Sequence, residues 1–185
     1  MDEALSKAVG VFSERGYHAT SIDDLIEAME LASGSIYKAF KDKRAVFVAA
    51  FDRYKAVRDE KLRAVLSQGK SGRERIRNAL VFYSEASQGA EGRQGCLVTG
   101  CATELATFDD EIAQRIKASL DRNEEMMSDL IRQGQSDGSI PAHVDSKATA
   151  RLMLCLVNGM RLIGKTGRTR AQMAAMVDVA MKTLD

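Results

Sequence analysis

The stretch from Leu31 to Phe47, LASGSIYKAFKDKRAVF, gathers side chains that can contact nucleic acid. Ser33, Gly34 and Ser35 are small enough to let a backbone approach closely, and their hydroxyl and N–H groups can meet phosphate oxygens or base edges. Tyr37 follows, and four Lys or Arg residues lie within seven positions. Because lysine donates hydrogen bonds to guanine and to phosphate, this composition indicates a DNA-binding surface.

The elements that would position these side chains form a helix-turn-helix. The spacing predicts a helix capped by Thr20, with Asp23 three residues later. Two or three residues separate it from a short helix capped by Ser33, which buries Ile36 and Phe40. A tight turn of this length is typical of DNA-binding helix pairs. The predicted DNA contacts are Thr20, Ser21, Ser33, Gly34, Ser35, Tyr37, Lys38, Lys41 and Lys43.

The rest of the chain also predicts helices, so the expected fold class is all-α. The 185 residues include one proline and no tryptophan, with few β-branched runs, and this composition favours helices. Apolar periodicity predicts about nine helices, with GAEGRQG as a glycine-rich loop. They span about residues 2–15, 20–30, 33–40, 43–66, 71–88, 96–106, 109–135, 145–165 and 169–184. We expect a small DNA-binding domain over residues 1–46 and a larger helical domain over 47–185.

Composition and cysteine usage exclude several classes of protein. No apolar segment is long enough to span a bilayer, and the first residues carry acids where a signal peptide would be basic. We therefore expect a cytoplasmic protein without a membrane partner. The three cysteines cannot all pair within one chain and are expected to be thiols. No metal site is expected, because His18 and His143 both lie away from the cysteines in the sequence. The sequence also shows no catalytic nucleophile pattern and no cofactor-binding loop.

The N-terminal sequence resembles the DNA-binding region of the tetracycline-repressor (TetR/AcrR) family. The matching motifs are a phenylalanine separated from RGY by two residues, Thr20-Ser21-Ile22 entering the second helix, GSIYKAF as the recognition helix and KDKRAVF opening the fourth helix. The resemblance implies an all-helical homodimeric repressor that binds a palindromic double-stranded DNA operator and is released by a small-molecule effector. The family's DNA-contacting positions fall on Thr20, Ser33, Gly34, Ser35, Tyr37, Lys38 and Lys43.

Two features depart from the family pattern. Members usually carry a basic extension before the first helix, whereas this first helix begins almost at Met1. The turn after the second helix reads Glu30-Leu31-Ala32 where a small turn with glycine is usual. We expect Leu31 to fill the inward position and Glu30 to occupy the position that favours glycine.

A repressor of this design needs an effector cavity in its helical body. The same side chains could instead be plain core, because apolar helix faces and methionines also fill cores. The candidate effector contacts are Phe82, Tyr83, Cys96, Thr99, Gly100, Glu104, Met126, Met127, Met153 and Asn158.

A cysteine-based switch is an alternative. GCLVTGCATELA resembles the sixth-helix segment of a branch of the family, some members of which respond to electrophiles or oxidants through cysteine. Cys96 would lie at a helix N-terminus near Arg93, a setting that activates thiols. A buried cysteine that packs as a small hydrophobe is the other possibility.

The last two helices predict a dimer interface. Their apolar stripes are wider than the core of one chain would cover, and two such helices from each subunit can form a four-helix bundle. Packing within one subunit is the alternative. The predicted interface residues are Leu152, Leu156, Gly159, Met160, Ile163, Met173, Met176, Val177, Ala180 and Leu184.

Two other classes of protein stay open on the sequence. One is a helical enzyme or non-enzymatic scaffold that merely contains a helix-turn-helix-like turn with a solvated lysine cluster. The other is a DNA-binding activator or architectural protein without a ligand. A deep apolar cavity in the body would count against this last class, and a solid body would support it.

Overall fold

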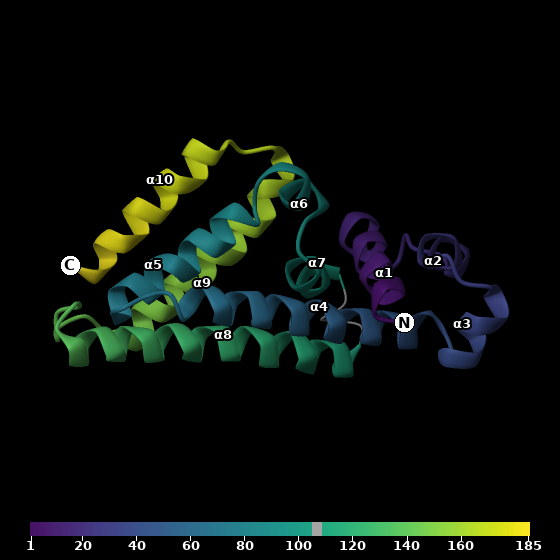
Figure 1. Cartoon of the computed structure of the whole chain (residues 1–185), viewed down its shortest axis with the longest axis horizontal. Helices are drawn as coiled ribbons and strands as arrows, with labels where there is room; N and C mark the ends of the chain where they lie inside the picture. Colours follow the sequence, from purple (N-terminus) through teal and green to yellow (C-terminus); the bar gives the residue numbers. More distant parts are fainter. Residues whose placement is uncertain (105–108) are drawn as a thin grey trace. The chain divides into compact units, whose positions relative to one another are not determined.

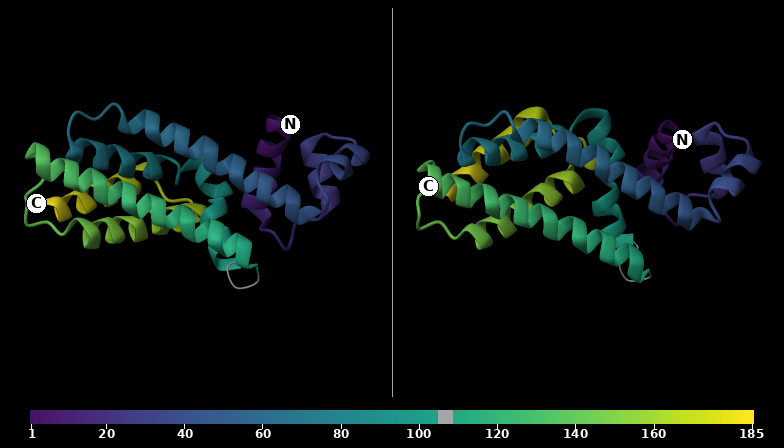
Figure 2. Two further views of the ribbon diagram at one scale, coloured as in Figure 1. Left: turned by 90° about the horizontal axis from the view of Figure 1, so that it is seen from below. Right: turned by 60° about the horizontal axis from the view of Figure 1, so that its bottom comes forward.

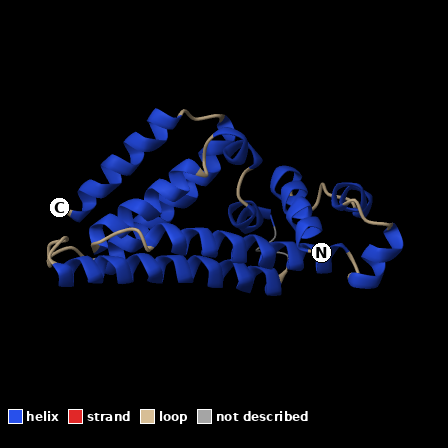
Figure 3. Cartoon of the chain, viewed as in Figure 1, coloured by secondary structure: helices blue, strands red, loops and turns tan. Residues whose placement is uncertain are grey.

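The chain is helical throughout the computed structural model, which describes residues 1–104 and 109–185 (Figures 1 and 3). No strand occurs within these residues, so the predicted all-α fold is confirmed. The described helices are α1 (Asp2–Arg15), α2 (Ile22–Met29), α3 (Ser33–Ala39), α4 (Lys43–Leu66), α5 (Gly72–Glu85), α6 (Gly89–Gln94), α7 (Leu97–Glu104), α8 (Asp110–Asp137), α9 (Ser146–Ile163) and α10 (Arg170–Met181), with short 3-10 helices η1 (Gly164–Thr166) and η2 (Lys182–Leu184). None of the described helices is both long and apolar enough to cross a membrane.

Helix α6 corrects the prediction of a loop at GAEGRQG. Alanine, glutamate, arginine and glutamine between the glycines are good helix formers. Gly89 starts the helix with a positive φ of 56°, which favours glycine. Gly92 packs so closely on the preceding turn that a Cβ there would lie 2.5 Å from the carbonyl of Ser87. The glycines are therefore explained by a positive φ and a close backbone contact, and not by a flexible loop. The predicted helix over 96–106 is described as far as Glu104, and its last two residues lie outside the described ranges.

The chain divides into two compact units. The first contains residues 1–59 and 94–116, and the second contains residues 60–93 and 117–185. The chain passes between the units within α4, within α8 and at the end of α6. The first unit thus holds all of the predicted DNA-binding residues together with α7 and the start of α8.

An aromatic cluster forms the centre of the first unit. The ring of Phe12 on α1 meets Phe47 on α4 edge-on, with centroids 5.1 Å apart. Tyr17, just after α1, packs against Phe47 at 5.2 Å. Leu25 on α2 and Ile36 on α3 are fully buried. Burial of these large side chains fixes the short helices α2 and α3, which are too short to be stable in isolation.

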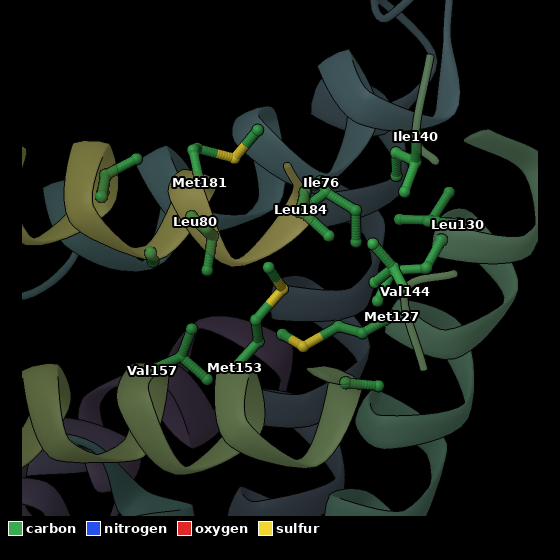
Figure 4. Close-up of a cluster of buried hydrophobic side chains, with 14 of the residues drawn as sticks. Ile76, Leu80, Met127, Leu130, Ile140, Val144, Met153, Val157, Met181 and Leu184 are labelled. Atoms are coloured by element: carbon green, nitrogen blue, oxygen red, sulfur yellow. The ribbon is translucent and has the colours of Figure 1, made fainter. Parts of the chain in front are cut away.

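The second unit has its own apolar core (Figure 4). Side chains from α5, α8, α9, α10 and η2 meet there, including Ile76, Leu80, Met127, Met153 and Leu184. The start of α5 crosses α8 so closely that a Cβ on Gly72 would lie 2.1 Å from the backbone nitrogen of Gly134. Figure 2 shows these helices from two further sides.

Four helices begin at polar capping residues close to the helix starts that the sequence predicts. Asp42 accepts from the first turn of α4 at 2.8 Å, and Ser71 accepts from the first turn of α5 at 3.2 Å. Asp145 accepts two N–H groups of α9 at 3.0 Å each, and Thr169 forms a capping box at the start of α10. A cap satisfies backbone donors that have no partner within the helix, which is why these starts are readable from sequence.

Candidate nucleic-acid interface

Helix α3 presents a polar face to solvent. Ile36 is fully buried and anchors the helix, while Tyr37 exposes 56% of its surface. The other predicted contacts on this helix, Ser33, Gly34, Ser35 and Lys38, are also exposed. A Cβ on Gly34 would meet nothing within 4 Å, so the tip of the helix is slim. Exposed hydroxyl, phenol and ammonium groups on a slim helix suit the major groove.

The start of α3 corrects the predicted cap. Ala32, in extended conformation, is the N-cap, and no side chain caps the helix. Ser33 is therefore the first helical residue, and its exposed hydroxyl is not used as a cap. This arrangement leaves the hydroxyl available to a ligand such as DNA.

In the turn between α2 and α3, a residue other than glycine occupies the position that favours glycine, as predicted. Glu30 adopts the left-handed conformation, with φ 54° and ψ 37°, and is the one non-glycine residue with positive φ among the described residues. Its carboxylate pairs with Lys7 on α1 at 2.7 Å. Leu31 is half-buried, as expected for the inward position. A non-glycine residue pays a conformational cost in this region of φ and ψ.

The start of α2 differs from the prediction by one residue. Ser21, not Thr20, is the N-cap, and it forms a capping box with Asp24. Hydrogen bonds from Ser21 lower the pKa of the Asp24 carboxyl, and Arg15 adds to this effect. Thr20 is buried, and its hydroxyl donates to the carbonyl of Gly16 at 2.6 Å. The assignment of the Thr20 side chain to DNA is therefore corrected, because that hydroxyl holds the preceding turn.

The two lysines before and at the start of α4 have different surroundings. Lys41 is exposed and remains a predicted phosphate contact. The ammonium of Lys43 donates to the carbonyls of Tyr17 at 3.0 Å and Thr20 at 2.9 Å, and it lies 4.3 Å from the centroid of the Tyr17 ring. Two of its three donors are thus used within the protein. A role for Lys43 at phosphate stays a prediction that rests on the third.

An ion-pair network at the N-terminal end of α4 was not predicted. Arg44 donates to Asp109 at 2.6 and 2.9 Å and to Glu111 at 2.7 Å. Arg115 bonds Glu111 and also Asp52 on α4. The hydrogen bond from Arg44 lowers the pKa of Asp109 to about 2 and also lowers that of Glu111. Separations of about 65 residues give no periodic signal, so sequence patterns could not pair these side chains.

The predicted effector residues fall into both compact units. Cys96, Thr99, Gly100 and Glu104 belong to the first unit, where Gly100 is exposed. The carboxylate of Glu104 accepts backbone N–H groups of the turn after α1, which corrects its assignment to an effector. The predicted effector residues of the second unit are Phe82, Tyr83, Met126, Met127, Met153 and Asn158.

Several of these second-unit side chains belong to the core. Met127 and Met153 are at most 1% exposed and lie in the apolar cluster, with Tyr83 and Met126 packed against it. The amide of Asn158 donates to the carbonyl of Leu154 on its own helix at 2.8 Å. The assignment of fully buried Met127 is corrected to core, and effector contact by the others stays a prediction.

The predicted dimer residues divide between the core and an exposed groove. Met160 and Met173 are 0% exposed and Val177 is 2% exposed within one chain, so the structure assigns them to the core and not to an interface. Buried Leu184 is corrected in the same way. An open apolar groove on α9 and α10 is lined by Leu152, Met153, Leu156, Ala175, Met176, Val179, Ala180 and Thr183. Gly159 and Ile163 are half-buried on α9.

The groove exposes large apolar side chains that would favour a partner. Leu152 is 54% exposed and Val179 is 64% exposed. Val179 was not among the predicted interface residues, although its spacing of four residues from Ala175 continues one face of α10. Within residues 1–104 and 109–185, no cluster of three or more His, Cys, Asp or Glu side chains could hold a metal ion.

Comparisons with known proteins fit this geometry. Residues 4–50 match the family model "Bacterial regulatory proteins, tetR family", and residues 72–180 match "Tetracyclin repressor-like, C-terminal domain". The HTH-type transcriptional repressor ComR of Escherichia coli (strain K12) is 28% identical over 184 residues, covering 99% of this chain and 86% of ComR. The HTH-type transcriptional repressor DhaR of Mycobacterium sp. (strain GP1) is 23% identical, covering 97% of this chain and 89% of DhaR.

Solved structures give the same result. A cysteine-substituted variant of the TetR family transcriptional regulator CifR, complexed with 26-base-pair operator DNA, superposes with a TM-score of 0.90 at 26% identity, covering 100% of this chain and 96% of that chain. A second CifR variant with operator DNA gives a TM-score of 0.87 at 28% identity, covering 98% and 95%. The second family model matches more than half of the residues. The chain therefore belongs to the TetR family of bacterial regulatory proteins, and the predicted function, a DNA-binding transcriptional repressor whose partner is double-stranded DNA, is confirmed.

Proposed function

We propose that the protein is a dimeric repressor that reads its operator with α3 and leaves the operator when a small molecule binds the helical body. The observation that carries the DNA-reading part is the exposed face of α3, where Tyr37 and Lys38 follow the fully buried anchor Ile36. Two copies of such a helix must lie about 34–36 Å apart to enter successive major grooves. A dimer with twofold symmetry then requires a palindromic operator.

The dimer part of the proposal is supported by the groove on α9 and α10. A monomer rarely leaves side chains such as Leu152 and Val179 more than half exposed side by side on an apolar surface. A twofold axis through this surface would bury both grooves at once.

The test uses operator selected from random duplexes and measures repression directly. A reporter gene placed behind the selected operator should be transcribed less when the protein is present and should recover when a cognate effector is added. Native mass spectrometry of the protein–operator complex should show two chains per duplex. Transcription that is unchanged by the protein, or one chain per palindrome, would contradict the proposal.

A switch through Cys96 is a second candidate, because the hydroxyl of Tyr54 donates to the sulfur of Cys96 at 3.3 Å. Cys96 is also only half-buried, whereas Cys101 is buried. Burial raises the pKa of Cys101 to about 12, so that thiol is unreactive at neutral pH. N-ethylmaleimide should therefore release operator from the protein and from Cys101→Ser but not from Cys96→Ser. Equal release from all three proteins would reject a role for Cys96.

A further inference from the structure

The turn between α1 and α2 is bound by a side chain from α7. Glu104, the last residue of α7, accepts the N–H of Tyr17 through Oε2 at 3.0 Å and the N–H of His18 through Oε1 at 2.6 Å. Both oxygens of one carboxylate are thus used by successive backbone donors. Charge-assisted hydrogen bonds of this kind are about twice as strong as neutral ones.

A cation from α4 binds the carbonyl groups of the same turn. The ammonium of Lys43 donates to the carbonyls of Tyr17 and Thr20 and lies over the Tyr17 ring. Backbone N–H groups of the turn therefore donate to the carboxylate of Glu104, and backbone carbonyl groups of the turn accept from the ammonium of Lys43. Tyr17 takes part in both sets of contacts, and its ring also packs on Phe47. The position of the turn is set by α7 and α4 together.

Gly16 makes the approach of Glu104 possible. It follows α1 with a φ of 83°, and a Cβ there would lie 2.6 Å from Oε2 of Glu104. Real Cβ atoms do not come this close to an oxygen, so any other residue would displace the carboxylate. The backbone conformation and the contact both require glycine at this position.

The turn controls the position of the DNA-binding helices. Buried Thr20 lies between the turn and the N-cap Ser21, so α2 begins directly where the bound segment ends. Three residues then connect α2 to α3. A shift of the turn must therefore be passed to α2 and, through the short connection, to the exposed face of α3. A misplacement of about 1 Å is enough to weaken directional contacts to base edges.

We propose that Glu104 is a positioning residue for operator binding. Its carboxylate, opposed by Lys43, holds the turn between α1 and α2 and thereby orients α3 for sequence-specific contact. Glu104 touches no DNA itself. Because base contacts need orientation and phosphate contacts are tolerant, loss of Glu104 should reduce binding to the operator more than binding to unrelated DNA.

The test compares Glu104→Gln with the matched control Glu60→Gln. Glutamine keeps the shape but places an NH2 group against a backbone N–H, whereas Glu60 is an exposed residue of α4 and its substitution makes the same change in charge. Affinities for the selected operator and for a scrambled duplex of equal length are measured for both variants. Glu104→Gln should lose about tenfold in the ratio of specific to non-specific affinity, while Glu60→Gln should keep the wild-type ratio. A loss of less than threefold for Glu104→Gln would overturn the proposal.

Hydrogen exchange of the unmodified protein gives an independent test that does not require the variant to fold. The amides of Tyr17 and His18 should exchange at least about tenfold more slowly than in an unstructured peptide, because both are bonded to Glu104. In folded Glu104→Gln, faster exchange at these two amides should accompany the loss of specificity. Exchange of both amides at the unstructured rate in the wild-type protein would overturn the proposal.

Discussion

Arg44, the second residue of α4, forms a bidentate ion pair with Asp109, which directly precedes α8: Nε lies 2.6 Å from Oδ2 and Nη2 lies 2.9 Å from Oδ1. Asp109 also accepts the N–H of Ile112 at 3.0 Å and so caps α8. The Asp109 side chain therefore caps the start of α8 and also binds the first turn of α4.

This pair predicts a pH-dependent contribution to stability. Arg44 lowers the pKa of Asp109 from 3.8 to about 2, so the contribution is fully present above about pH 4 and is lost as the pH falls towards 2. Asp109→Asn keeps a capping side chain but removes the charge, so it should lower Tm at pH 7 and differ little from wild type near pH 2. Asp110→Asn, an exposed neighbour in the first turn of α8, should not show this convergence. Thermal unfolding followed by circular dichroism from pH 2 to 7 measures the difference. A constant difference in Tm between Asp109→Asn and wild type across this range would contradict the prediction.

The left-handed conformation of Glu30 predicts that glycine at this position gives a more stable protein than alanine. Glu30→Gly and Glu30→Ala both remove the exposed ion pair with Lys7, which contributes at most about 1 kcal/mol. They differ in the cost of the left-handed conformation, so Glu30→Gly should be more stable than Glu30→Ala by about 1 kcal/mol. Urea unfolding of the two variants gives this difference in the free energy of unfolding. If the alanine variant is as stable as the glycine variant, Glu30 is not strained.

Lys38 and Lys41 should affect DNA binding in different ways. Lys38→Ala should relax the preference at one base position at a cost of about 1–3 kcal/mol. Lys41→Ala should weaken binding to all sequences and reduce the salt dependence by about one unit of slope, because it removes one phosphate contact. Affinities for operator and scrambled duplexes, measured at several salt concentrations, distinguish the effect of Lys38→Ala from that of Lys41→Ala. A changed base preference in Lys41→Ala, or an unchanged one in Lys38→Ala, would reverse the assignments.

Neighbouring alanines on α10 test the dimer surface. Ala175 lines the apolar groove, whereas Ala174 is exposed and lies outside it. A glutamate at position 175 would bury a charge between two subunits, so Ala175→Glu should convert the dimer into a monomer. Ala174→Glu should leave the dimer intact. Sedimentation at micromolar concentration measures the mass of each variant, and an intact Ala175→Glu dimer would place the interface elsewhere.

The sequence predicted most helices because their signals are local. The helix starts predicted near residues 43, 71, 145 and 169 agree with the observed caps Asp42, Ser71, Asp145 and Thr169, and apolar spacing located the buried faces. The prediction at Thr20 was wrong by one residue, since two adjacent hydroxyl residues both qualify as caps and only packing decides between them.

The remaining site residues depend on contacts between distant segments. Glu104 binds the turn after α1 rather than an effector, and no periodic pattern connects positions 86 or 87 residues apart. Lys43 donates to the same turn across separations of 26 and 23 residues, which also give no periodic signal. On α9, Met160 and Leu152 belong to the same kind of apolar stripe, yet one is fully buried and the other is more than half exposed. Which part of the α9 stripe is covered depends on how α5 packs against it.

Selection of a binding site from random duplex DNA shows whether two copies of α3 read a palindromic operator. The protein is mixed with a randomised library, bound duplexes are recovered through several rounds, and the enriched sequences are aligned. We expect a palindrome whose half-sites are centred about one helical turn, or a multiple of it, apart, because two α3 helices related by twofold symmetry would read it. Enrichment of a single unrepeated half-site would contradict the dimeric mode of reading. No enrichment above the starting library would contradict sequence-specific DNA binding itself.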